Sequence, residues 1–363
     1  MALDAATLAL TAAELKATLT DAKIAKLFEP TRDELVLTLR TRTDTYALLL
    51  SARSGSARVC LTEESLKPGD APSFCMLMRK HLTGGRLLDV HMEPGDRIVY
   101  FDFQCTNEMG DLVRNTLCAE LMGRYSNLVL VQNGKIIDAL KRVDFEDSDV
   151  RQLLPGLPYT TPPKPARPDF LLVSSASIVA AACERDLPVA DALNKTVAGV
   201  GPVVCREAAW RAFDGEHLPA NELTEEQKRK LMAAIDELKE EHATGGTPCS
   251  VTDPSGKPIE YTFFRPQPVR RKYIIKEWPS FNAMLEATTL RRTARNACAP
   301  KARSCTRRCT ICTSAPCASR PPVRKSLLPA ARAKSCVCTV SLLSANLYLA
   351  RRHEEHHRAQ LVR

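Results

Sequence analysis

A β-hairpin is predicted by residues 128–137, which read Leu128-Val129-Leu130-Val131-Gln132-Asn133-Gly134-Lys135-Ile136-Ile137. An Asn-Gly pair between two apolar runs is the strongest short-range signal for such a turn, because both turn positions require positive φ angles. The two strands are expected over 128–132 and 135–137. The N-terminal half of the chain should therefore contain an antiparallel sheet.

The sequence before this hairpin alternates between helical and strand patterns. Apolar residues three, four or seven apart indicate helices, and alternating or β-branched runs indicate strands. These patterns predict, in chain order, a helix containing Leu8, Leu15 and Leu19, a strand at Glu34–Arg40, a helix over 72–82 ended by Gly84-Gly85, and a strand at Arg97–Phe103. Residues 1–165 are therefore expected to form an α+β domain with antiparallel strands.

The sequence after the hairpin changes character twice. A Pro-rich stretch, Leu154–Pro168, is either a linker or a loop draped over the domain. Helices are then expected within Ser174–Phe213, where Pro202 opens the last one, and from a capping box at Thr224 and Gln227 to about His242. Residues 170–245 are thus a predicted helical domain. Residues 246–286 should hold a strand pair followed by the start of a coiled coil.

The net charge of the chain comes from its C-terminal segment. The chain has 363 residues and a formal charge of +9, but 287–363 contains 16 Lys and Arg against two Glu. The remaining 35 basic and 40 acidic residues leave the first 286 residues slightly acidic. The overall charge therefore does not by itself indicate nucleic-acid binding. No signal peptide or membrane-spanning run is recognisable. The seven cysteines before Ala287 are scattered singly, so we expect them to be small buried hydrophobic residues, as suits the cytoplasm.

Half of the cysteines also lie in the C-terminal segment. Cys309 and Cys312 have a spacing that zinc sites use, with Cys305 and Cys317 nearby. A second suitable pair is missing, because Cys336 and Cys338 are too close together. We therefore expect no metal site and no cofactor.

Two short motifs are candidate binding sites. Gly199-Val200-Gly201-Pro202 precedes a helix, so its backbone N–H groups could point outward at a phosphate, or it could be a tight turn between packed helices. Asp96-Arg97 follows Pro94-Gly95 and opens a strand. This acid–base pair could hydrogen-bond a ribose, a terminal adenosine or a phosphate of RNA, or it could be a solvated turn.

The first 286 residues resemble the NFACT family of ribosome quality-control proteins. The resemblance rests on many stretches in order: Met1–Asp4, Asp33–Leu35, Phe74–Leu82, Gly95–Val99, Glu120–Asn127, Leu153–Tyr159 and Val200–Pro202. One departure is Tyr125, where the family usually has His. So many matches in sequence order are far more specific than any single motif.

The resemblance implies an N-terminal domain shaped like that of formamidopyrimidine-DNA glycosylases, a helix-hairpin-helix middle domain and a coiled coil. Family members bind obstructed large ribosomal subunits that carry peptidyl-tRNA. They recruit tRNA, alanyl-tRNA in bacteria, for untemplated extension of the stalled chain. The expected tRNA- and ribosome-binding residues, carried over from matching stretches, are Asp4, Asp96, Arg97, Arg124, Gly199 and Gly201.

The segment 287–363 departs from the family. A coiled coil needs apolar heptads flanked by Glu and Lys, yet no acid occurs between Ala287 and His353. If codons are chosen freely for 288–298, 311–319 and 334–341 and are translated in a reading frame that starts one base earlier, the result is a charged sequence like that of the family. Leu342–Tyr348 again matches the family in the present reading frame. We therefore expect a frameshifted, disordered tail, a disrupted coiled coil and weakened binding to ribosomal subunits.

Two other functions compete with this interpretation. A DNA glycosylase would share the N-terminal shape, but Ala2-Leu3 stands where those enzymes carry an N-terminal proline and a catalytic glutamate. A fibronectin-binding surface adhesin is suggested by an older name for the family, and the absence of a recognisable signal peptide argues against it. No catalytic nucleophile is apparent, so we expect an RNA-binding factor and not an enzyme.

Overall fold

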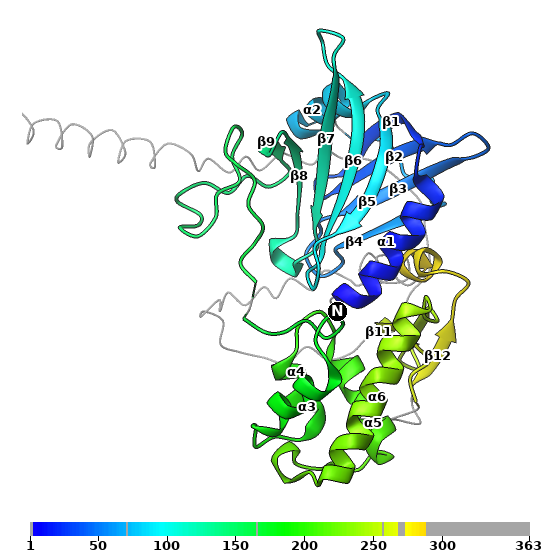
Figure 1. The fold of residues 1–363 in the computed structure, drawn as a ribbon. Helices are drawn as coiled ribbons and strands as arrows, with labels where there is room; N and C mark the ends of the chain where they lie inside the picture. The colour runs from blue at the N-terminus through cyan, green and yellow to red at the C-terminus, as the bar shows by residue number, and fades with distance from the viewer. Residues whose placement is uncertain (1–2, 70–71, 165, 256–257, 268–272, 288–363) are drawn as a thin grey trace, which may run out of the picture. The chain divides into compact units, whose positions relative to one another are not determined.

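The N-terminal half forms a nine-stranded antiparallel sheet in a computed structural model that describes residues 3–69, 72–164, 166–255, 258–267 and 273–287. The strand order is β4-β3-β2-β1-β5-β6-β7-β8-β9 (Figure 1). The strands are β1 (Lys23–Thr31), β2 (Glu34–Arg40), β3 (Thr45–Ser51), β4 (Arg58–Thr62), β5 (Arg86–Met92), β6 (Ile98–Thr106), β7 (Leu112–Glu120), β8 (Asn127–Gln132) and β9 (Lys135–Ala139).

The sheet folds over at the junction of β1 and β5. These two strands share a single register pair, Lys23 with Arg86, whereas the other neighbours pair over several residues. The inward faces of both halves contribute to one apolar core, which includes Leu35, Leu48 and Phe101. The two halves therefore pack face to face.

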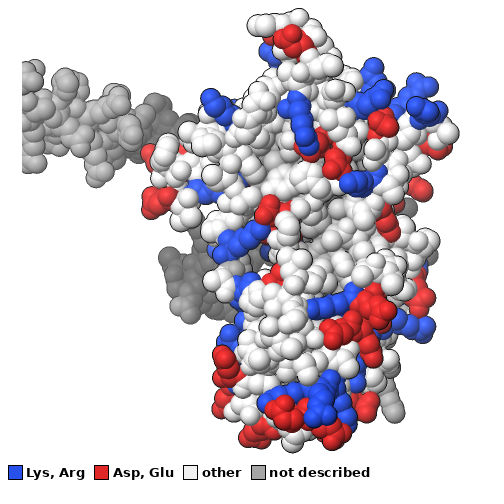
Figure 2. Space-filling model, viewed as in Figure 1, with Lys and Arg blue, Asp and Glu red and all other residues white. Residues whose placement is uncertain are grey.

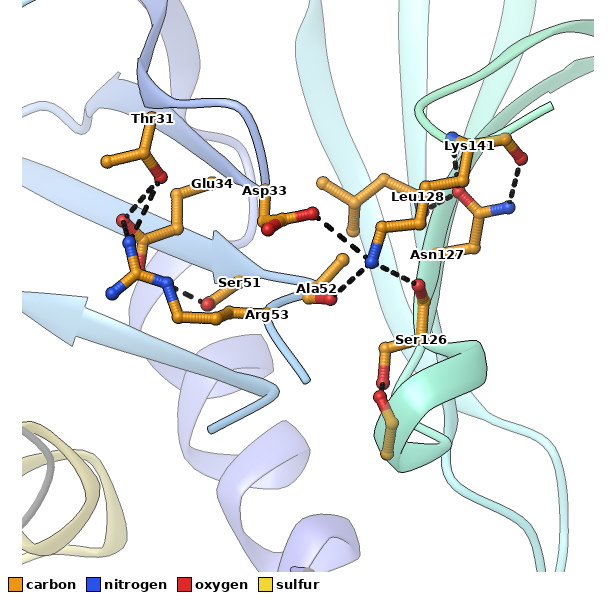
Figure 3. A network of polar contacts seen from close by, with 11 residues as sticks. Thr31, Asp33, Glu34, Ser51, Ala52, Arg53, Ser126, Asn127, Leu128 and Lys141 are labelled. Atoms are coloured by element: carbon orange, nitrogen blue, oxygen red, sulfur yellow. Dashed lines mark hydrogen bonds and ion pairs between the residues drawn. The ribbon is translucent and has the colours of Figure 1, made fainter. Parts of the chain in front are cut away.

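Lys141, just after β9, joins the two halves at their edge (Figure 3). Its ammonium group lies 3.2 Å from Asp33 Oδ1 and donates to the carbonyl oxygens of Ala52 at 2.8 Å and Ser126 at 3.2 Å. Asp33 and Ala52 belong to the first half of the sheet, and Ser126 belongs to the second. One side chain thus uses its three donors to hold the folded sheet closed.

The predicted hairpin and the two predicted N-terminal helices are confirmed. Asn133 and Gly134 have φ angles of 50° and 73° between β8 and β9, as a two-residue turn of this kind requires. The helices are α1 (Ala5–Leu19) and α2 (Ser73–Leu82), with apolar faces in the shared core. The mixed α+β class with antiparallel strands is therefore correct.

The region after residue 170 is helical, as the sequence predicts. Its elements are α3 (Ser175–Cys183), α4 (Val189–Thr196), α5 (Pro202–Phe213), a 3-10 turn η2 (Ala220–Glu222) and α6 (Glu225–Ala243). Pro202 occupies the first turn of α5, and Thr224 and Gln227 form the expected capping box of α6. The helix-hairpin-helix assignment and the domain boundaries stay predictions.

The Pro-rich stretch is a loop draped over the sheet. The N–H of Ile136 donates to the carbonyl of Leu157, and the N–H of Tyr159 donates to that of Gly134, both at 2.8 Å. Arg151 forms two hydrogen bonds, of 2.9 and 2.6 Å, with the buried carboxylate of Glu120. Residues 143–164 are called the strap below.

A three-stranded sheet follows α6. It contains the predicted pair, β10 (Cys249–Thr252) and β11 (Pro258–Thr262), and also β12 (Ile274–Glu277), which the sequence analysis did not identify. A helix then begins at residue 281. Its first N–H groups, those of Phe281 and Asn282, donate to the carboxylate of Glu14 in α1.

Side chains of this helix also cover the edge of the large sheet. Asn282 Oδ1 accepts the N–H of Leu61 in β4 at 3.1 Å. Glu286 Oε1 accepts the N–H of Glu63 at 2.6 Å and the hydroxyl of Thr62 at 2.8 Å. The first turns of this helix are therefore hydrogen-bonded to the N-terminal sheet.

Of the remaining predictions, one is largely confirmed and another concerns residues that the structure does not describe. Six of the cysteines before Ala287 are buried as expected, whereas Cys183 is half-buried. The predictions of a frameshifted, disordered tail and of no metal site among the cysteines from Cys298 to Cys338 concern residues 288–363, which lie outside the described residues. Within the described residues no helix is long and apolar enough to cross a bilayer.

Candidate functional site

A cavity of about 420 Å³ brings five of the six predicted binding residues together. Its walls come from the start of α1, the turn between β5 and β6, the end of the strap and the turn between α4 and α5. The predicted residues that line it are Asp4, Asp96, Arg97, Gly199 and Gly201. We call this cavity the Asp–Arg pocket.

The Asp96–Arg97 turn presents a cation that has no partner among the residues that the structure describes. Asp96 Oδ1 accepts the N–H of Arg97 at 2.7 Å, which orders the turn, and Arg97 C=O accepts the N–H of Leu121 at 2.8 Å. Among the described residues, the Arg97 guanidinium forms neither an ion pair nor a hydrogen bond. A half-buried guanidinium with all its donors available is suited to an anionic ligand.

Asp4 has a structural position at the base of the pocket. Its Oδ1 accepts the N–H of Thr7 at 2.9 Å, which caps α1, and its Oδ2 accepts the N–H of Gly201 at 3.0 Å. Burial raises the pKa of Asp4, while the hydrogen bonds from Thr7 and Gly201 oppose that rise. One carboxylate therefore serves the N-terminal ends of two helices, α1 and α5.

This geometry corrects one expectation about the Gly199–Pro202 turn. The N–H of Gly201 does not point outward at a phosphate, because it donates to Asp4. The carbonyl of Gly199 likewise accepts the N–H of Ala6 at 3.0 Å. The turn lines the pocket, yet these two backbone groups are occupied by the start of α1.

Three further charged residues of the pocket were missed by the sequence analysis: Lys164, Arg167 and Asp169. Lys164 Nζ donates to Glu93 Oε1 at 2.6 Å, and Arg167 Nη1 donates to the carbonyl of Asn194 at 3.0 Å. All three lie in or just after the Pro-rich stretch, where no periodic pattern indicates which way a side chain points. Their charges were visible in the sequence, but their position was not.

Arg124 is the one predicted residue that does not line the pocket. It lies in the 3-10 turn η1 (Gly123–Tyr125) and is exposed. Its guanidinium lies over the Tyr125 ring, 4.6 Å from the centroid, and donates to the Tyr125 hydroxyl at 2.5 Å. An exposed arginine stacked on an aromatic ring is a common surface for nucleic-acid bases and phosphates.

The surface shown in Figure 2 carries charges of both signs. Acidic and basic side chains are interspersed on the face shown in Figure 2, without a large area of one sign. The pocket itself combines Arg97, Lys164 and Arg167 with three aspartates. In the described part of the chain, no three His, Cys, Asp or Glu side chains are grouped so as to hold a metal ion.

The family model for the NFACT N-terminal and middle domains matches residues 4–359. The chain belongs to this family. It is similar to the "Rqc2 homolog RqcH" of Streptococcus suis, with 38% identity over 155 residues, 42% of this chain and 28% of that protein. It is also similar to the RqcH of Bacillus subtilis, with 31% identity over 230 residues, 62% of this chain and 39% of that protein.

An archaeal relative, "Archaeal Rqc2 homolog aRqcH" of Methanocaldococcus jannaschii, is 31% identical over 234 residues, 62% of this chain and 32% of that protein. The matched part thus spans about a third of the length of these relatives. The fold is shared with the fibrinogen binding protein of Staphylococcus aureus, at a TM-score of 0.65 and 25% identity over 79% of this chain and 98% of that one.

A second solved structure, the N-terminal part of the fibronectin/fibrinogen-binding protein of Streptococcus suis, has a TM-score of 0.63 and 27% identity, covering 80% of this chain and all of that one. The family predicted from the sequence is therefore confirmed. The likeness to formamidopyrimidine-DNA glycosylases stays a prediction, as do the roles of the six site residues.

Proposed function

We propose that this NFACT protein is a non-enzymatic factor of ribosome quality control. It binds tRNA and, more weakly because of the departure at 287–363, obstructed large ribosomal subunits that carry peptidyl-tRNA, and it positions tRNA, alanyl-tRNA in bacteria, for untemplated extension of the stalled chain. The peptide bond forms at the ribosome's own catalytic centre. The protein acts in the cytoplasm and needs neither a metal ion nor a cofactor.

The observation that supports this proposal best is the guanidinium of Arg97 inside the Asp–Arg pocket, which no described residue pairs with or hydrogen-bonds. Arg97, Lys164 and Arg167 offer donors to phosphate oxygens, and Asp96 retains one carboxylate oxygen that no described residue contacts. RNA presents both kinds of partner, because phosphates accept hydrogen bonds while base amino groups and 2′-hydroxyls donate them. The similarity to proteins named RqcH gives the RNA class its support.

A direct test measures binding of the 363-residue chain to bulk tRNA over a range of salt concentrations. Phosphate contacts make the logarithm of affinity fall with the logarithm of salt concentration. The Arg97→Ala variant should bind more weakly and should reduce that slope by about 1, because one phosphate contact is lost. Arg32→Ala is the matched control, since Arg32 is exposed in the turn between β1 and β2.

Three outcomes would contradict the proposal. Equal losses in Arg97→Ala and Arg32→Ala would show that the pocket has no particular role. Absence of tRNA binding, together with retention of fibronectin on immobilised protein, would favour the adhesin function that the names of the solved relatives suggest. Cleavage of a duplex containing an oxidised base would favour a glycosylase.

A further inference from the structure

Asp169, in the turn that follows the strap, lies between the two glycine turns of the pocket. A Cβ atom built on Gly95 would lie 2.3 Å from Asp169 Oδ2, and one built on Gly199 would lie 3.3 Å from Asp169 Oδ1. Both glycines have positive φ angles, +68° and +86°. The carboxylate therefore rests directly against two backbone turns that only glycine allows to come so close.

The backbone around Asp169 fixes the carboxylate in this place. Its Oδ1 accepts the N–H of Leu171 at 2.7 Å, which closes a local turn. The N–H of Phe170 donates to the carbonyl of Ala198 at 3.0 Å, and the N–H of Ala198 donates to the carbonyl of Pro168 at 2.8 Å. Asp169 is thus tied to the Gly199 turn on one side and touches the Gly95 turn on the other.

We infer that Asp169 is a positioning residue, which holds the Asp96–Arg97 turn of the sheet at a fixed distance from the Gly199–Pro202 turn of the helical region. The side chain holds the turns apart by filling the space between Gly95 and Gly199, and this role depends on its shape and not on its negative charge. The inference rests on the proposed function for its ligand, a strand of RNA. The placement of the two turns is a property of the free protein and can be measured without RNA.

The test compares three variants in tRNA binding. Asp169→Ala empties the space and should weaken binding about tenfold, because the pocket is no longer preorganised. The salt slope should stay unchanged, since no phosphate contact is removed. Asp169→Asn keeps the shape and the acceptor for Leu171, so it should restore most of the lost affinity. Asp186→Ala, in an exposed loop after α3, is the matched control.

A double-mutant cycle adds an independent measure of the contact. Gly95→Ala places a methyl group against the carboxylate, so it should weaken binding on its own. In the double variant Gly95→Ala/Asp169→Ala the collision is absent, and the combined loss should be smaller than the sum of the two single losses. Additive losses would contradict contact between the two positions.

Hydrogen exchange of the free protein separates this inference from the proposed function. Asp169→Ala should speed exchange of the amides of Asp96, Phe170 and Ala198, all of which are hydrogen-bonded in the turns. If wild-type protein binds no tRNA while these amides respond, the proposed function fails and the positioning role stands. Equal loss of affinity in Asp169→Asn and Asp169→Ala, or unchanged exchange at all three amides, would overturn the inference.

Discussion

Replacement of Asp4 by alanine should destabilise the protein through two helix ends at once. The first loss is the cap of α1, since Asp4 Oδ1 accepts the N–H of Thr7 at 2.9 Å. An N-cap replaced by alanine costs about 1 kcal/mol. The second loss is the hydrogen bond from Gly201 to Oδ2 at 3.0 Å. A hydrogen bond to a charged group contributes about 1.5–3 kcal/mol, and the Gly201 N–H is left without its acceptor.

These terms add to about 3 kcal/mol, after some allowance for the cost of burying the Asp4 carboxylate, which the raised pKa reflects. For a protein of this size, such a change lowers the melting temperature by roughly 4–5 °C. Asp4→Asn should lose about half as much, because the amide keeps one oxygen that can accept only one of the two N–H groups well.

The measurement is chemical denaturation followed by circular dichroism, with hydrogen exchange at the Thr7 and Gly201 amides. Both amides should exchange faster in Asp4→Ala, since both lose their acceptor. Asp186→Ala serves as the control for loss of one carboxylate at an exposed position. A loss of less than about 1 kcal/mol in Asp4→Ala, with Gly201 still protected, would refute the reasoning.

Three further variants test other parts of the molecule. Burial raises the pKa of the Glu29 carboxyl group to about 7, so the unfolding free energy of the wild type should fall as pH rises from 4.5 through 7. The unfolding free energy of Glu29→Gln, compared with that of the wild type, should therefore increase between pH 5 and pH 9. A constant difference between the two proteins would contradict this. Lys141→Met should cost about 2–3 kcal/mol in urea unfolding because three acceptors lose their donor, whereas Lys135→Met, at an exposed site, should cost less than about 0.5. Arg124→Ala should lower the salt slope of tRNA binding by about 1. It should leave the unfolding free energy nearly unchanged, because the described partner of Arg124 is the neighbouring, exposed Tyr125. An unchanged salt slope would show that Arg124 does not belong to the binding surface.

Elements with local signals could be predicted from the sequence. The turn at Asn133-Gly134 and the capping box at Thr224 depend on residues within three positions of each other, and both occur as expected. β12 was missed because its four residues, Ile274–Glu277, are too short to show a reliable alternation. Local patterns also do not reveal that the sheet folds over between β1 and β5, since that depends on distant strands sharing one core.

The candidate site shows the same limit. Five of the predicted residues meet in one pocket, yet they were chosen by resemblance to a family and not from any contact visible in the sequence. The bond between Asp4 and Gly201 joins residues 197 positions apart, so no local pattern could show that the Gly201 N–H points inward. Asp169 was missed for a related reason, because its role depends on two turns that only the folded chain brings together.

The helix that starts at residue 281 has a consequence for solubility. Edge strands offer unpaired N–H and C=O groups to other chains and are a common starting point for aggregation. Asn282 and Glu286 occupy the outward N–H groups of Leu61 and Glu63 along the β4 edge. A fragment shortened to end before residue 281 would therefore expose a bare strand edge, and we expect it to precipitate at concentrations where a fragment ending after Glu286 stays in solution.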